Sequence, residues 1–216
     1  MTWLSNNWID VLDLAGTHLA LCVPPLFLSL LIALPLGRLA FTSPRLGRPL
    51  LNAAALLYTI PALPLLIVIP LVVGIPLRSP VTMILALTVY GVALLVRSVA
   101  DAFASVDARV REGAIATGYS RRSLFWQVDI PLAVPVILAG LRVVSSSTVG
   151  LVTIGALVGI PSLGTLITDG FQRSITAEVL VGVLATVILA LLIDAALQLL
   201  GRFLTPWRHQ RAEVFA

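Results

Sequence analysis

The residues of this sequence that could do chemistry are few, and they fall in two places. A polar segment at about 97–130 carries Glu112 and several arginines, which could form directional hydrogen bonds and ion pairs with another molecule. Arg142 and Asp194 lie instead within apolar runs, where an unpaired charge is costly. One hypothesis is that these two side chains form an ion pair or a hydrogen bond with each other. The alternative is that the fourth span begins in the cytoplasm and leaves Arg142 near the membrane interface.

Several kinds of site are excluded by residue type. These 216 residues contain no lysine, so they lack the P-loop lysine that reaches the β- and γ-phosphates of ATP. No cluster of His, Cys, Asp or Glu has metal-ligand spacing, and the two histidines have no evident partners for a hydrolytic triad. We therefore expect no metal and no cofactor on this chain, and we expect a partner to supply the energy for any active process.

The composition places most of the chain in lipid. Hydrophobic residues make up 59% and charged residues only 11%, and the mean hydropathy is +1.06. The sequence thus predicts an all-α, polytopic membrane protein with about five transmembrane helices. The predicted spans are His18–Leu36, Leu50–Gly74, Val81–Val96, Leu132–Gly159 and Val179–Leu200.

The arginines alternate between the loops that separate these spans. The first set follows the first, third and fifth spans and comprises Arg38, Arg45, Arg48, Arg97, Arg109, Arg111, Arg121, Arg122, Arg202, Arg208 and Arg211. The opposite set holds only Arg78 and Arg173. The positive-inside rule therefore predicts an external N-terminus and a cytoplasmic C-terminus. Clusters beside apolar runs also argue against nucleic acid as the partner.

The polar segment between the third and fourth spans is expected to form a cytoplasmic helix, turn, helix elbow. Asp107–Thr117 reads as a short helix that Gly118 can end in the left-handed conformation, and Ser120 can cap a second short helix. The small residues Gly113 and Ala114 would let a partner's backbone approach closely. The alternative is a solvated connector with an ordinary exposed glutamate.

A spaced pattern in this segment resembles the EAA loop of ABC importer permeases. The pattern begins with Glu112-Gly113-Ala114, continues with Gly118 and the nine-residue spacer 119–127, and ends with Val128-Asp129-Ile130-Pro131. Gly113 departs from the usual alanine but stays small, although it weakens the helix by roughly 1 kcal/mol. The segments 58–63 and 131–142 are most similar to the permeases for glycine betaine, choline and carnitine.

The resemblance implies a single transmembrane domain over 1–216, in the bacterial inner membrane, that acts as a permease subunit and not as an enzyme. The implied partners are two cytoplasmic ATPases that bind ATP and Mg, a second permease subunit, identical or paralogous, and an external substrate-binding protein. The residues implied to couple to the ATPase are Arg109, Arg111, Glu112, Gly113, Ala114, Gly118, Tyr119 and Arg121. Alternatives are a permease for methionine or another amino acid and, in a different class, a membrane enzyme or a passive channel.

Two stretches within the spans are candidates for the translocation pathway. The second span contains several prolines and should bend, so Tyr58, Thr59 and Pro61 are candidates for lining the pathway. The alternative is a kink that only improves helix packing. Ser146 belongs to a small, weakly polar stretch of the fourth span, for which packing between permease subunits is the competing interpretation.

Overall fold

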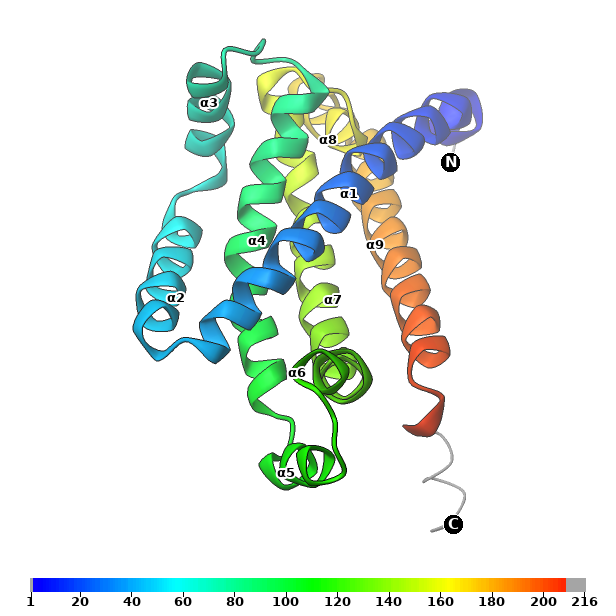
Figure 1. Cartoon of the computed structure of the whole chain (residues 1–216). Helices are drawn as coiled ribbons and strands as arrows, with labels where there is room; N and C mark the ends of the chain where they lie inside the picture. The colour runs from blue at the N-terminus through cyan, green and yellow to red at the C-terminus, as the bar shows by residue number, and fades with distance from the viewer. Residues whose placement is uncertain (1, 209–216) are drawn as a thin grey trace.

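A computed structural model describes residues 2–208, and every element in this range is helical (Figure 1). The predicted all-α class is thereby confirmed. Arg211, counted above among the cytoplasmic arginines, lies outside the described residues. In chain order the elements are α1 Thr2–Thr42, α2 Pro44–Thr59, α3 Ala62–Val73, α4 Pro80–Ala104, α5 Ala108–Ala116, α6 Arg121–Leu124, the π-helical η1 Phe125–Asp129, α7 Ile130–Ile154, the 3-10 turn η2 Gly155–Val158, α8 Leu163–Gln172, α9 Thr176–Leu204 and the 3-10 turn η3 Pro206–Arg208.

Within residues 2–208, four helical segments are long and apolar enough to cross a membrane alone. They correspond to the first, third, fourth and fifth predicted spans and cover Trp3–Thr42, Pro80–Ala104, Arg121–Val158 and Thr176–Leu204. The second predicted span is the pair α2 and α3, whose axes are bent by 106°. Counted as one broken span, this pair brings the total to the five that the sequence predicts.

The break in the second span lies at Ile60 and Pro61. Both residues adopt extended backbone, with ψ of 124° and 144°. Proline lacks an N–H donor and disfavours the helical conformation of the residue before it, so α2 ends at Thr59. The proline-rich sequence therefore does more than kink a helix, because two separate helices result.

The core is formed where α1 crosses α4 and α7 (Figure 1). Leu95, Val99 and Phe103 of α4 are fully buried there. Gly37 of α1 permits a close approach, since a Cβ atom at this position would lie 2.6 Å from Cβ of Val99. Small residues at helix crossings bring backbones together in membrane proteins, where apolar surface alone does not drive association.

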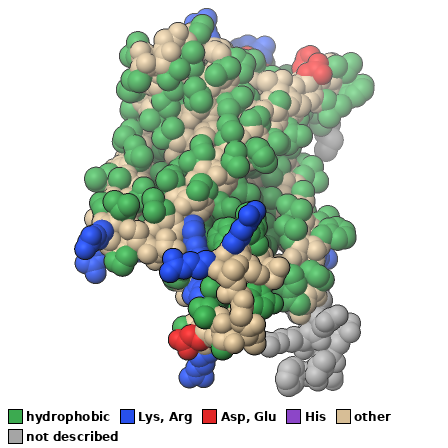
Figure 2. All heavy atoms as spheres, in the orientation of Figure 1, with side chains coloured by type: hydrophobic (Ala, Val, Ile, Leu, Met, Phe, Trp, Pro, Cys, Tyr) green, Lys and Arg blue, Asp and Glu red, His purple; other side chains and the backbone are tan. Residues whose placement is uncertain are grey.

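The arginine-rich segments share one end of the molecule. The α1–α2 connection, α5 with α6, and the C-terminal end of α9 lie at this end, while α3's C-terminal end and α8 lie at the other (Figure 1). Figure 2 shows arginine side chains gathered mainly at the first end and hydrophobic side chains over the middle. We take the arginine-rich end as cytoplasmic because of its charge.

The helix α8 was not predicted from the sequence. It follows the fourth span at the end opposite the arginines, and Ser162 starts it with a capping box that includes Thr165. Gly164 lies so close to α7 that a Cβ atom there would be 2.1 Å from the carbonyl oxygen of Thr153. The chain between the fourth and fifth spans is therefore packed against the bundle.

We predict that Gly37→Ala destabilises the protein by about 1–3 kcal/mol, because the added methyl group overpacks the crossing of α1 and α4. Gly16→Ala is the matched control in the same helix, since a Cβ atom at Gly16 meets nothing within 4 Å. Thermal unfolding in detergent measures both variants. Equal melting temperatures for the two would contradict the packing that the structure describes.

Candidate functional site

The elbow between the third and fourth spans is a short helix closed at both ends by hydrogen bonds. The Asp107 carboxylate caps α5 by accepting a hydrogen bond from the amide of Arg109 at 2.9 Å. At the other end Gly118 has φ +92°, and its amide donates to the carbonyl of Ile115 at 3.0 Å. The amide of Tyr119 donates to the carbonyl of Ala114 at 3.1 Å. These paired bonds form a Schellman motif, which ends the helix at the glycine that the sequence indicated.

The second predicted short helix is the beginning of the fourth span itself. Ser120 caps α6, since its hydroxyl accepts a hydrogen bond from the amide of Ser123 at 3.1 Å. The chain then passes through the π-helical turn η1 into α7 without a break. Insertions of π-helix are frequent at functional sites. The elbow is thus continuous with a span on its C-terminal side.

Most of the predicted contact residues lie on the surface of this elbow. The helix α5 buries none of its residues, and a Cβ atom on Gly113 would meet nothing within 4 Å. The face is therefore open to a partner. The residues of the set that are exposed are Arg109, Glu112, Gly113, Gly118, Tyr119 and Arg121, and Ala114 is partly exposed.

Arg111 differs from the rest of the set because it points into the protein. Its guanidinium donates to Asp129 Oδ1 at 2.7 Å, to the carbonyl of Val106 at 3.1 Å and to the carbonyl of Phe103 at 2.5 Å. The resemblance placed Arg111 among the residues that couple to the ATPase, which stays a prediction, and the structure shows that its guanidinium is hydrogen-bonded within the chain. The physical reason is that the carbonyls at the end of α4 and a buried carboxylate lie on its side of the helix.

Arg38 and Asp129, which lie where the ends of α1 and α4 meet η1, were not predicted as site residues. We call this meeting point the junction. Arg38, at the cytoplasmic end of α1, forms an ion pair of 2.8 Å with the other carboxylate oxygen of Asp129, which is 1% exposed. The guanidinium of Arg38 lies 4.9 Å from the ring centre of Phe103 and 5.1 Å from that of Phe125. The only feature of the sequence that could have indicated these two residues is the acid Asp129 within the otherwise apolar group 128–131.

The structure also brings Arg142 and Asp194 together, one from α7 and one from α9. The two side chains form a bidentate ion pair, with Nε to Oδ1 at 2.5 Å and Nη2 to Oδ2 at 2.8 Å. Gln198 donates a further hydrogen bond to Oδ2 at 2.7 Å. This geometry satisfies both charges inside helices that are otherwise apolar.

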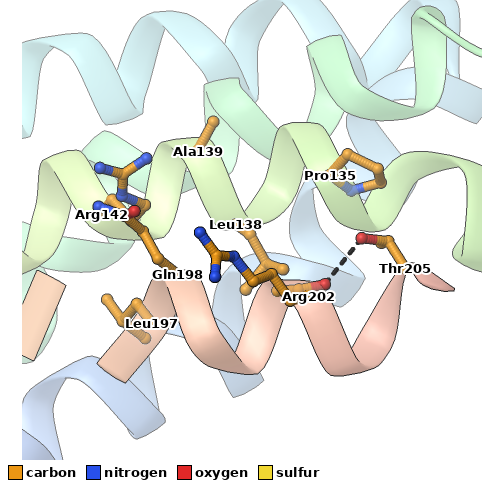
Figure 3. Close-up of a pocket in the computed structure, with 9 residues that line it drawn as sticks. Pro135, Leu138, Ala139, Arg142, Leu197, Gln198, Arg202 and Thr205 are labelled. Carbon is orange, nitrogen blue, oxygen red and sulfur yellow. Dashed lines mark hydrogen bonds between the residues drawn. The ribbon is translucent and has the colours of Figure 1, made fainter. Parts of the chain in front are cut away.

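A groove of about 370 Å³ lies beside this ion pair, between α7 and α9 (Figure 3). Its polar lining comes from Arg142, Gln198 and Arg202, and Leu138 and Leu197 contribute apolar surface. A second shallow groove on the other side of Arg142 includes Ser146, which is exposed. Ser146 thus lies near the intramembrane charges.

The other predicted pathway residues lie at the break of the second span. Tyr58 packs against Tyr90 of α4 with ring centres 5.0 Å apart, and the Tyr90 hydroxyl donates to the Tyr58 carbonyl at 3.2 Å. The hydroxyl of Thr59 donates to the carbonyl of Leu56 at 2.6 Å. Pro61 is the N-cap residue of α3, in extended backbone, and is exposed. Their place in a pathway remains a prediction.

Among residues 2–208, no group of three or more His, Cys, Asp or Glu side chains is placed to hold a metal ion. The charges described above occur as ion pairs and exposed arginines, without a set of ligands that converges on one point. The chemistry that this arrangement offers is therefore recognition by polar contacts at the elbow and charge pairing within the bundle.

We predict that Asp194→Leu lowers the yield and the melting temperature of the protein, because Arg142 loses its partner. An uncompensated arginine at the centre of a membrane helix costs about 2.5–3.5 kcal/mol on insertion scales. The double variant Arg142→Leu with Asp194→Leu removes both charges and should regain most of the loss. Quantitative expression and thermal unfolding in detergent compare the three proteins. A double variant less stable than Asp194→Leu would rule out this role for the pair.

The known proteins that are similar to this chain are components of membrane transport systems. The family model described as "Binding-protein-dependent transport system inner membrane component" matches residues 26–210. The choline transport system permease protein OpuBD of Bacillus subtilis is 30% identical, over 98% of this chain and 92% of its own length. The osmoprotectant import permease protein OsmW of Salmonella typhimurium is 34% identical, over 94% of this chain and 96% of its own. A chain of the MetNI methionine ABC transporter, solved in inward-facing conformations, shares the fold with a TM-score of 0.80 at 23% identity, covering 95% of this chain and 98% of that one.

Proposed function

Because the chain belongs to the family of binding-protein-dependent transport system inner membrane components, we propose that it is the permease subunit of an ATP-driven importer for a quaternary-amine osmoprotectant. Glycine betaine, choline and carnitine are the expected substrates. The chain is a multi-pass protein of the bacterial inner membrane and serves transport.

The observation that carries this proposal is the open elbow at the arginine-rich end. It presents Glu112, Gly113 and Ala114 on α5, which buries none of its residues. The second short helix of the elbow, α6, continues through η1 into the transmembrane helix α7. A helix built to pack within its own chain would bury an apolar stripe. A surface of small residues beside charged side chains suits close docking of another protein's backbone.

We assign this docking surface to a cytoplasmic ATPase. Two such subunits would bind ATP and Mg and hydrolyse the nucleotide, because these 216 residues lack the lysine of a P-loop. A second permease subunit, identical or paralogous, would complete the pathway. An external binding protein would deliver the substrate and select it, and a cage of aromatic rings for the quaternary ammonium group belongs there.

The substrate assignment is supported by the names of the relatives over nearly the full length of the chain. The methionine transporter shares the fold at lower identity, which does not bear on substrate. Within the membrane, the broken second span with Tyr58, Thr59 and Pro61 is our candidate for the pathway, since non-helical backbone in a bilayer needs cover from protein or a water-filled cavity.

We predict that Gly113→Asp and Gly118→Leu reduce the ATP hydrolysis that co-purifies with the tagged protein. The first places a charged side chain on the docking face, and the second forces a branched residue into φ +92°, which costs roughly 1–2 kcal/mol. Both variants should still insert into the membrane. Arg122→Ala, an exposed position of the same elbow outside the predicted contact set, is the control. Retention of the ATPase by both glycine variants would argue against the elbow as its docking site.

The substrate is tested by uptake into proteoliposomes that contain the complete complex. Labelled glycine betaine should accumulate in the presence of ATP and the binding protein, and unlabelled choline or carnitine should compete with it. Competition by methionine alone would favour the amino-acid alternative. Uptake that proceeds without ATP would instead indicate a passive channel.

A further inference from the structure

The helix α5 lacks the apolar anchor that a surface helix normally has. None of its residues is buried, and Val110, the valine of its first turn, is 46% exposed. A helix that a partner pulls on must nevertheless be fixed to its own protein, or the pull would only bend the elbow. The attachment of α5 must therefore come from polar contacts.

Arg111 supplies that attachment. Among residues 2–208, it forms the only ion pair of α5, the 2.7 Å contact with Asp129 in η1. Its two other hydrogen bonds go to the carbonyl of Phe103 in the last turn of α4 and to that of Val106, two residues past the end of α4. One side chain thus ties α5 to the ends of two transmembrane helices, α4 and, through η1, α7.

Arg38 extends the same link to a third transmembrane helix. It is separated from Asp129 by 91 positions in the sequence, yet its guanidinium lies 2.8 Å from the carboxylate oxygen that Arg111 does not use. The ring of Phe41 lies 5.6 Å from the Arg38 guanidinium carbon and 4.9 Å from that of Arg111, so one aromatic ring contacts both cations. The carboxylate between them is almost completely shielded from solvent. Arg38 Nη2 and Asp129 Oδ2 form an ion pair without hydrogen-bond geometry, and this shielded pair resists separation because parting would leave a buried charge unpaired.

The charges at this junction are unequal, with two arginines for one carboxylate. Loss of Asp129 would leave two cations facing each other, which explains why an acid is needed here. Loss of Arg38 alone would leave the balanced pair of Arg111 and Asp129, together with the bonds of Arg111 to α4. The link to α1 can therefore be cut while the elbow keeps its internal contacts.

We infer that Asp129 is a positioning residue through which Arg38 makes α1 follow the ATPase-docking helix α5. The inference rests on the proposed function and adds a route to it. Because α1 crosses the bundle from the cytoplasmic end towards the outer end, displacement of α5 reaches the outer half of the protein by this route (Figure 1). This route through α1 is separate from the covalent connection that runs from α6 through η1 into α7.

The test is Arg38→Gln in the reconstituted complex, with Arg45→Gln as control because Arg45 is an exposed arginine in α2 near the same end. Substrate transported per ATP hydrolysed should fall about fivefold or more in Arg38→Gln, which is the lower range of typical coupling between sites. Co-purification of the ATPase should not change, since the docking face stays intact. Arg38→Lys keeps the charge near Asp129 and should regain part of the coupling.

A distance measurement separates positioning from simple stability. Spin labels on cysteines introduced at the exposed Thr42 and Thr117 report the ends of α1 and α5, and the single native cysteine, Cys22, is buried. With labelled copies diluted by unlabelled ones, pulsed EPR should give the same narrow distance with and without ATP, and Arg38→Gln should broaden it.

The possible outcomes are distinct. Absence of ATPase from the unmodified complex would overturn the proposed function itself. If Arg38→Gln retains the ATPase and its transport per ATP is unchanged, only the link to α1 is overturned. The link is also overturned if Arg38→Gln loses assembly with the ATPase and transport to the same extent. A wild-type distance that changes on addition of ATP would also overturn the link.

Discussion

Lipid offers no hydrogen-bond partners, and this constraint governs every part of the structure. Each span must satisfy its own backbone, so the chain is helical wherever it crosses. The exception, at Ile60 and Pro61, interrupts the second span and must be covered by protein or face water. Charges within the spans must be neutralised by neighbours, and Arg142 meets Asp194 in a bidentate pair for that reason. Helices must also approach closely without a hydrophobic drive between them, as Gly37 allows.

The elbow at the arginine-rich end meets the opposite demand, because most of its residues are exposed. Its helix α5 buries none of its residues and presents both small and charged side chains. Hydrogen bonds hold this helix in place of apolar packing. Asp107 caps its start, the Gly118 turn ends it, and Arg111 binds Asp129 of the bundle. The same elbow is thus exposed on one side and attached to the bundle on the other. In the function that we propose, this attachment transmits a displacement of the elbow to the bundle.

Much of the fold and part of the candidate site could be predicted because local chemistry determines them. Apolar runs of sufficient length must span, and a glycine after a short amphipathic helix ends it. Arg142 and Asp194 could be paired in advance because charged side chains deep inside spans seek each other. The inward turn of Arg111 and the role of Arg38 could not be predicted. Both depend on a carboxylate that arrives from another part of the chain, and no local pattern specifies its position.

From the residues alone it follows that most of the chain lies in lipid, where the chain crosses, how its elbow begins and ends, and that these 216 residues lack the lysine of a P-loop. Composition, proline, glycine and the absence of lysine act locally, so they can be read without coordinates. The tertiary structure alone decided the 106° angle of the second span, the packing of α8, and the sharing of Asp129 by two arginines. Those features depend on which helix faces come together, and that choice follows from the packing of the whole bundle.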